Sequence, residues 1–197
     1  MCGVHYGHAR RTSRRWTGRE VRELIAAAPL ATPRYEVVDG DLLVTPSPSA
    51  AHQRAITQLF ALLLPYLERE RVGVLIASPC DVELELDFVT QPDLCVVPAV
   101  EWRRVMRDGF PVRQLLLAIE VLSPSSSRHD RVCKRPVYQR HVPDYWIVDL
   151  DARLFEHWKP GDERPALVVD TLTWHPAGAT TPFTLSIPTF FAAIFDA

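Results

Sequence analysis

The spacing of apolar residues predicts a helix and a hairpin in the first quarter of the chain. Thr17-Gly18-Arg19-Glu20 is typical of a capping box, so we expect a helix over residues 17–28, before Pro29. Residues 35–44 alternate around Asp39-Gly40, a pair that favours the tight turn of a β-hairpin.

A longer helix and a series of strands are predicted next. After the proline- and serine-rich residues 46–49, apolar positions recur at helical spacing at Ile56, Leu59, Phe60, Leu63 and Leu67. Short apolar or alternating runs then predict strands at 74–77, 81–87, 91–97, 115–122, 144–150 and 154–158. The other segments are a partly helical connection at 99–113, a helix at 130–141, a short β segment and a terminal helix from near Pro188.

This order of elements indicates an α+β fold in which a mixed central sheet is flanked by helices. No linker or repeat divides residues 17–197, so we expect one domain, and its length is sufficient for one sizeable core. We expect residues 1–16 to form a flexible basic tail, because Arg10, Arg11, Arg14 and Arg15 cluster there. A solvated tail is the favoured interpretation, and a nucleic-acid arm is the other.

Composition limits the function classes. The formal net charge of −2 excludes a polycation, so any nucleic-acid contact must come from local basic patches. No apolar run is long enough to span a membrane. The four cysteines form no CxxC pair, which argues against a zinc site or a disulfide framework and favours a cytoplasmic location.

Two acidic residues lie within otherwise apolar strands. Asp93 follows Pro92 at the start of one predicted strand, and Glu120 comes near the end of another. A buried carboxylate is costly unless it is neutralised, paired or bound to a metal. If the two strands are neighbours, both acids meet at one edge of the sheet. This arrangement predicts a Mg²⁺ or Mn²⁺ site, with the Val121 carbonyl as a further ligand.

Pro92-Asp93 and Glu120-Val121-Leu122 resemble the PD-(D/E)XK nuclease superfamily, in which a Pro-Asp pair precedes an acid-x-lysine strand. The resemblance departs at Leu122, where the superfamily has lysine. Residues 120 and 122 share one face of a strand, so an apolar side chain stands in the place of the ammonium.

A subfamily accounts for this departure. From about Arg34 to the C-terminus the chain resembles the Uma-two family of bacterial endonucleases, which have a restriction-endonuclease-like core. The matching motifs are Tyr35-Glu36-x-x-Asp39-Gly40, His52 after the proline-serine loop, Asp81-Val82, Gln91-Pro92-Asp93-Leu94, Glu120-Val121-Leu122-Ser123-Pro124-Ser125, Asp130-x-x-x-Lys134-x-x-x-Tyr138 and Val142-Pro143-Asp144-Tyr145-Trp146-Ile147-Val148-Asp149. In that family the lysine lies on the following helix, which makes Lys134 the counterpart.

The resemblance implies a metal-dependent endonuclease that hydrolyses phosphodiester bonds in DNA. Asp93 and Glu120 would bind Mg²⁺ or Mn²⁺, and Lys134 would orient the attacking water and offset charge on the phosphate. Pro136 lies inside the predicted helix and bears on where Lys134 is placed. The auxiliary candidates for the site are Glu36, His52, Gln91 and Asp130.

Structural roles are the alternative for each of these residues. Asp93 would then cap a turn, and Glu120 would form an ion pair with Lys134 that stabilises the fold without catalysis. The alternative functions are therefore a catalytically inactive nucleic-acid-binding module and a homodimeric interaction protein that keep the nuclease fold.

Overall fold

The computed structural model describes residues 15–27, 34–38, 40–45, 49–123 and 127–196. Most of the predicted tail, Asp39 of the predicted turn and the loop at 46–48 lie outside the described residues.

The predicted capping box and hairpin are confirmed. The Thr17 amide donates to Glu20 Oε2 at 2.9 Å, and the Glu20 amide donates to Thr17 Oγ1 at 3.3 Å. The helices are α1 (Gly18–Ala27), α2 (Ala50–Glu70), α3 (Ala99–Asp108), α4 (Ser127–His129), the π-helical turn η1 (Asp130–Lys134), α5 (Arg135–His141) and α6 (Ile187–Phe195). The strands are β1 (Arg34–Val38), β2 (Asp41–Thr45), β3 (Gly73–Ala77), β4 (Val82–Glu85), β5 (Phe88–Thr90), β6 (Leu94–Pro98), β7 (Leu117–Val121), β8 (Asp144–Asp149), β9 (Leu154–Trp158), β10 (Ala166–Val168), β11 (Thr171–Trp174) and β12 (Phe183–Ser186).

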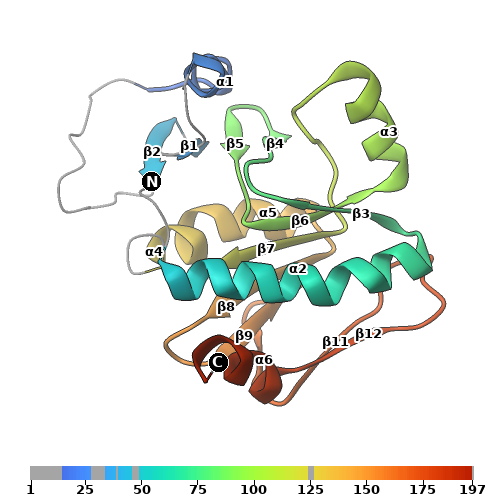
Figure 1. Cartoon of the computed structure of the whole chain (residues 1–197). Coiled ribbons are helices and arrows are strands. Elements are labelled where there is room, and N and C mark those ends of the chain that lie inside the picture. The colour runs from blue at the N-terminus through green and yellow to red at the C-terminus, as the bar shows by residue number, and fades with distance from the viewer. Residues whose placement is uncertain (1–14, 28–33, 39, 46–48, 124–126, 197) are drawn as a thin grey trace.

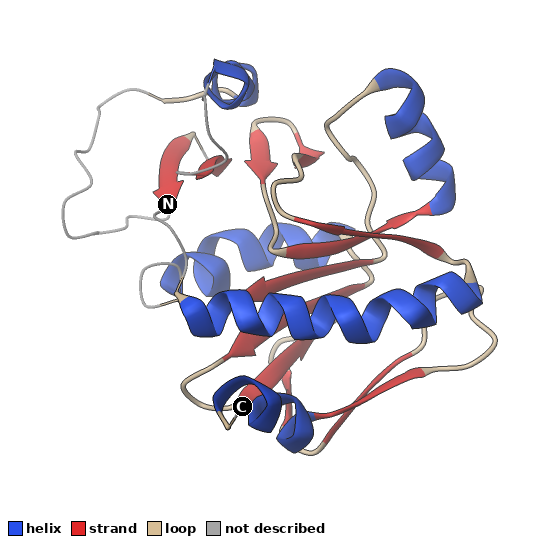
Figure 2. Ribbon diagram, viewed as in Figure 1, coloured by secondary structure: helices blue, strands red, loops and turns tan. Residues whose placement is uncertain are grey.

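A mixed six-stranded sheet forms the centre of the molecule, as predicted (Figures 1 and 2). Its order is β10-β9-β8-β7-β6-β3, and β7 and β8 are parallel while the other neighbours are antiparallel. A second sheet of order β2-β1-β5-β4 stands beside α1, and β11 and β12 form a two-stranded sheet.

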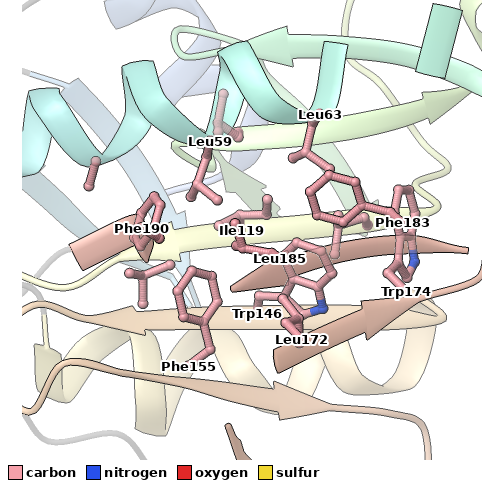
Figure 3. Close-up of a cluster of buried hydrophobic side chains, with 14 of the residues drawn as sticks. Leu59, Leu63, Ile119, Trp146, Phe155, Leu172, Trp174, Phe183, Leu185 and Phe190 are labelled. Carbon is pink, nitrogen blue, oxygen red and sulfur yellow. The ribbon is translucent and has the colours of Figure 1, made fainter. Parts of the chain in front are cut away.

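Side chains of alternate residues in the central strands form two separate cores. Leu117, Ile119 and Val121 of β7 join the larger core, with apolar residues of α2, α6, β11 and β12. Figure 3 shows this face, where Leu59 and Leu63 of α2 lie above Ile119 and Trp146. Ala118 faces the other core, which contains Tyr138 and Val142. Glu120 lies on the same face of β7 as Ala118, so its carboxyl group enters the second core beneath α5.

The strand predictions need two corrections. Residues 81–87 were expected to form one alternating strand, but β4 ends at Glu85 because Asp87 adopts a positive φ of 58° in a turn, which leaves Leu86 90% exposed. The chain then returns as β5, a short strand that the pattern did not separate from the next one. Likewise, the expected short β segment near the C-terminus is three strands, β10 to β12.

Within the described residues, no helix combines the length and apolar character that crossing a bilayer requires.

Candidate active site

The register of β6 and β7 brings the two predicted acids together. Leu94 lies opposite Ile119 in this antiparallel pair, so the next step along both strands places Asp93 opposite Glu120. Each is 2% exposed. The expectation that the two strands are neighbours is therefore confirmed.

Asp93 is held by a backbone amide and a histidine. The Val121 amide donates to Asp93 Oδ2 at 2.9 Å, and His52 Nε2 lies 3.1 Å from the same oxygen. His52 is in the first turn of α2, where its amide donates to the capping hydroxyl of Ser49. Because the amide and carbonyl of a strand residue point to the same side of the strand, the Val121 carbonyl also faces β6 and Asp93.

Lys134 lies among three further carboxylates. Its Nζ is 3.0 Å from Glu36 Oε1, 3.0 Å from Glu120 Oε1 and 3.1 Å from Asp130 Oδ1. The lysine is 3% exposed and Asp130 1%, so these charges are almost fully removed from water. We call Glu36, Asp93, Glu120, Asp130 and Lys134 the acid cluster.

Glu36 connects the smaller sheet to the acid cluster. The backbone amide of Gln91 donates to Glu36 Oε1 at 2.7 Å, which ties β1 to the segment before β6. The Gln91 side chain donates instead to Asp81 Oδ1 at 2.7 Å. Gln91 therefore supports the site through its backbone amide.

The helix that carries Lys134 contains a π-helical turn, which explains how the helix accommodates Pro136. The Arg135 amide bonds to the Asp130 carbonyl, five residues back. The Arg131 carbonyl, released by this shift, accepts from Arg135 Nε at 2.8 Å. Proline has no N–H for the Val132 carbonyl and would crowd it in a regular α-helix, and the wider turn accommodates this. The helix continues to His141, and Lys134 reaches Glu120.

A comparison with protein families identifies the family of this chain. The model of the Uma2 family, described as "Putative restriction endonuclease", matches residues 22–190. The chain belongs to the Uma2 family. The match begins ahead of the Arg34 expected from the motifs and contains the whole acid cluster, so the chain is a candidate nuclease.

The Uma2 fold is also seen in a solved structure. A putative nuclease belonging to DUF820 from Anabaena variabilis ATCC 29413 superimposes with a TM-score of 0.73 at 20% sequence identity, over 89% of this chain and 98% of that chain. At this identity the likeness supports the fold, which is restriction-endonuclease-like as predicted. No curated protein matches the chain.

Carboxyl groups outnumber the ammonium group in the acid cluster of this Uma2 site. The acid cluster holds four carboxyl groups and one ammonium, and burial, followed by the charges of Asp130, Asp93 and Glu36, raises the pKa of Glu120 well above its ordinary value. Lys134 opposes this rise.

The donor set fits a magnesium ion better than a metal held entirely by side chains. Among the residues that the structure describes, no three His, Cys, Asp or Glu side chains are grouped so that they could hold a metal ion. Asp93, Glu120 and the Val121 carbonyl supply oxygen donors, and Mg²⁺ is commonly bound by one or two carboxylates with water and substrate phosphate.

Leu122 belongs to the second core, with Tyr138 and Tyr145. Its side chain is 8% exposed. The position that carries lysine in the larger superfamily is therefore occupied here by an apolar side chain that packs under α5. Lys134 approaches Glu120 from that helix instead. Tyr138 also donates to Glu120 Oε1, at 3.3 Å, and its hydroxyl lies 2.9 Å from Thr90 Oγ1.

One residue of this region was missed by the motif analysis. His129 is 5% exposed, and neither of its ring nitrogens has a hydrogen-bond partner within the described part of the chain. Burial and the nearby Lys134 ammonium lower the pKa of His129 to about 4, against the opposing effect of Glu36. Helical spacing gave no signal for it, because it lies five residues before Lys134.

Proposed function

We propose that the chain is a Mg²⁺- or Mn²⁺-dependent endonuclease that hydrolyses phosphodiester bonds in DNA. The observation that carries this proposal is the pairing of Asp93 with Glu120 across two neighbouring strands, with Lys134 3.0 Å from Glu120. Family membership supports it, since the whole arrangement lies within the matched residues.

Asp93, Glu120 and the Val121 carbonyl would hold the divalent ion. When bound, the ion would supply charge neutralisation at the phosphate and activation of a water molecule. A site of this kind would depend on correct orientation of the two carboxylates rather than on their presence alone.

The chain's own residues perform the orientation. His52 and the Val121 amide hold Asp93 Oδ2 from two directions and so fix the orientation of this carboxylate. His52 is thus proposed as a positioning residue. Lys134 would place its ammonium beside the phosphate and the attacking water, where it offsets developing negative charge. Glu36 and Asp130 fix the ammonium by their contacts of 3.0 and 3.1 Å.

The test is cleavage of plasmid and oligonucleotide DNA with Mg²⁺, with Mn²⁺ and with a chelator. We expect Asp93→Asn and Glu120→Gln each to lower the cleavage rate by on the order of 10²–10³-fold, because each removes a charged oxygen donor. Asp108→Asn is the matched control, since Asp108 is an exposed acid on α3 paired with Arg107. RNA of the same sequence separates the two nucleic-acid classes.

Thermal unfolding gives a second readout that does not depend on turnover. A ligand that binds the folded chain raises its melting temperature, so Mn²⁺ should stabilise the native protein and should not stabilise Asp93→Asn. Cleavage that survives both acid substitutions would refute the site. Salt-sensitive DNA binding without cleavage and without a Mn²⁺ shift would support the inactive binding module instead.

A further inference from the structure

Tyr138 contacts Glu120 from the helix that follows Lys134. Its hydroxyl lies 3.3 Å from Glu120 Oε1, the same oxygen that the Lys134 ammonium approaches to 3.0 Å. The tyrosine is on α5, four residues beyond the lysine, and its side chain is fully buried. One oxygen of Glu120 therefore meets a charged donor and a neutral donor together.

Thr90 lies behind Tyr138 and completes a chain of hydroxyl groups. Its Oγ1 is 2.9 Å from the Tyr138 hydroxyl, and the threonine, at the end of β5, is also fully buried. A carboxylate accepts hydrogen bonds and donates none, and each hydroxyl has a single proton to donate. With Glu120 ionised, both contacts are hydrogen bonds only if Thr90 donates to Tyr138 and Tyr138 donates to Glu120.

Aromatic packing holds the ring that carries this hydroxyl. The Tyr138 ring meets Phe88 edge to face, with ring centroids 6.1 Å apart and an interplanar angle of 90°. On another side its centroid is 4.7 Å from that of Tyr145. Both neighbours are buried, and a ring in so closely packed a core has little freedom to move. The fold therefore sets the position of the hydroxyl relative to Glu120.

We propose that Tyr138 is a positioning residue for the Glu120 carboxylate, and that Thr90 fixes the direction in which Tyr138 donates. The inference rests on the proposed function, in which Glu120 binds the divalent ion, and it names the groups that orient this ligand. Hydrogen bonds to a metal-binding carboxylate fix its orientation and tune its affinity for the ion. A carboxylate with two donors on one oxygen loses both contacts when it rotates, so the protein alone sets its geometry.

The test measures Mn²⁺ affinity by isothermal titration calorimetry in the absence of DNA. Tyr138→Phe keeps the ring and its packing and removes the hydroxyl. Loss of a hydrogen bond to a metal ligand typically lowers metal affinity by about 10–100-fold. We expect Tyr138→Phe to bind Mn²⁺ on the order of 10-fold more weakly, with an unchanged number of ions per chain.

Thr90→Val tests the order of donors. Valine keeps the shape of threonine and removes its hydroxyl, so the Tyr138 hydroxyl is no longer polarised from behind. We expect this variant to bind Mn²⁺ about 2- to 3-fold more weakly. The double variant should bind Mn²⁺ as Tyr138→Phe does, because Thr90 acts only through the phenol. Additive losses in the double variant would overturn the chain from Thr90 through Tyr138.

Tyr66→Phe is the matched control. Tyr66 is also a buried tyrosine, and its hydroxyl donates to the Thr181 carbonyl at 2.9 Å, but it belongs to the larger core. Its replacement should lower the melting temperature and leave Mn²⁺ affinity unchanged. A purely structural Tyr138 would behave in the same way. If the native chain and Tyr138→Phe bind Mn²⁺ equally tightly, the inference is overturned.

Crystal structures of the metal-free proteins separate this inference from the proposed function. We expect the Glu120 carboxylate to have one orientation in the native chain and in Tyr66→Phe, and to turn or become disordered in Tyr138→Phe. If the native chain binds no Mn²⁺ but the carboxylate turns in Tyr138→Phe, the positioning role holds and the metal-dependent assignment fails. A carboxylate that keeps its native orientation in Tyr138→Phe would refute the positioning role.

Discussion

Lys134 contacts three carboxylates at once and is almost completely buried. Breaking a buried ion pair by removing one partner costs about 3–5 kcal/mol, because the remaining charges are left uncompensated. We therefore expect Lys134→Met to lower the unfolding free energy by about 3–5 kcal/mol at pH 7.5, measured by urea denaturation. The loss should shrink as the pH falls toward 5, because burial raises the pKa of Glu120 and this carboxylate then takes up a proton. Lys159→Met, at an exposed lysine, is the control and should be neutral at both pH values.

Glu120 should make the stability of the protein depend on pH in a defined direction. Burial raises the pKa of Glu120 well above its ordinary value of 4.5, so the folded chain binds this proton more tightly than the unfolded chain. The resulting stabilisation is complete below about pH 4.5 and is lost as the pH rises through the folded-state pKa.

Glu120→Gln removes this ionisation and keeps the shape of the side chain. Its unfolding free energy should vary less with pH, and at pH 8 it should exceed that of the native chain by about 1–2 kcal/mol while activity is lost. Urea denaturation between pH 5 and pH 9 measures both effects. A variant that is less stable than the native chain at pH 8 would show that the ion pair with Lys134 outweighs burial.

At the level of single residues, the sequence was informative where a side chain contradicted its surroundings. Asp93 and Glu120 were recognisable as acids inside apolar strands, and the structure places them opposite each other. Lys134 came from the family resemblance. His129 gave no signal, because nothing in the sequence marks a histidine whose ring is buried without a hydrogen-bond partner among the described residues.

At the level of elements, the π-helical turn η1 carries Lys134 and determines where it points. Its formation is favoured by Pro136, which cannot donate to the Val132 carbonyl as an α-helix requires. Pro136→Ala restores this donor, so regular α-helical bonding becomes competitive and would rotate the residues before it. We expect a cleavage rate about 10-fold lower with the unfolding free energy changed by no more than about 1 kcal/mol.

The matched control for Pro136→Ala is Pro65→Ala. Pro65 also lies within a helix, α2, but it lies away from the acid cluster, so the control should leave cleavage unchanged. Full activity of Pro136→Ala would show that the turn persists without the proline.

Element prediction succeeded where periodicity was strong and failed where strands were short. The long helix α2 and the strands β6 to β9 follow directly from their apolar spacing. By contrast, β5 and β10 are three residues each, too short for an alternating pattern to mark them. Their pairing is decided by tertiary contacts with β1, β4 and β9, which local sequence does not contain.

At the level of the whole molecule, the two cores lie on opposite faces of the central sheet, and Glu120 enters the second. The larger core can therefore be weakened without direct change at the site. Trp174 is 1% exposed in this core, and its Nε1 donates to Asp144 Oδ2 at 3.1 Å. Trp174→Ala should lower the unfolding free energy by about 3–5 kcal/mol through the cavity it leaves.

Activity per folded molecule in Trp174→Ala should stay within about 2-fold of the native value at 20 °C, since distant sites behave nearly independently. Leu167→Ala, at an exposed residue of β10, is the control for stability and should change it by no more than about 0.5 kcal/mol. A large loss of activity in folded Trp174→Ala would show that the two faces of the sheet are coupled.

The position of Leu122 has a consequence for how such nucleases evolve and are found. With the ammonium on a helix and the carboxylates on strands, the two halves of the site can change separately, and the strand position is free to take any residue that packs well. A linear signature that demands an acid and a lysine two positions apart would pass over this chain. Distant relatives are better sought by the contact between a strand acid and a helix lysine, because this contact does not depend on the spacing of the two residues in the sequence.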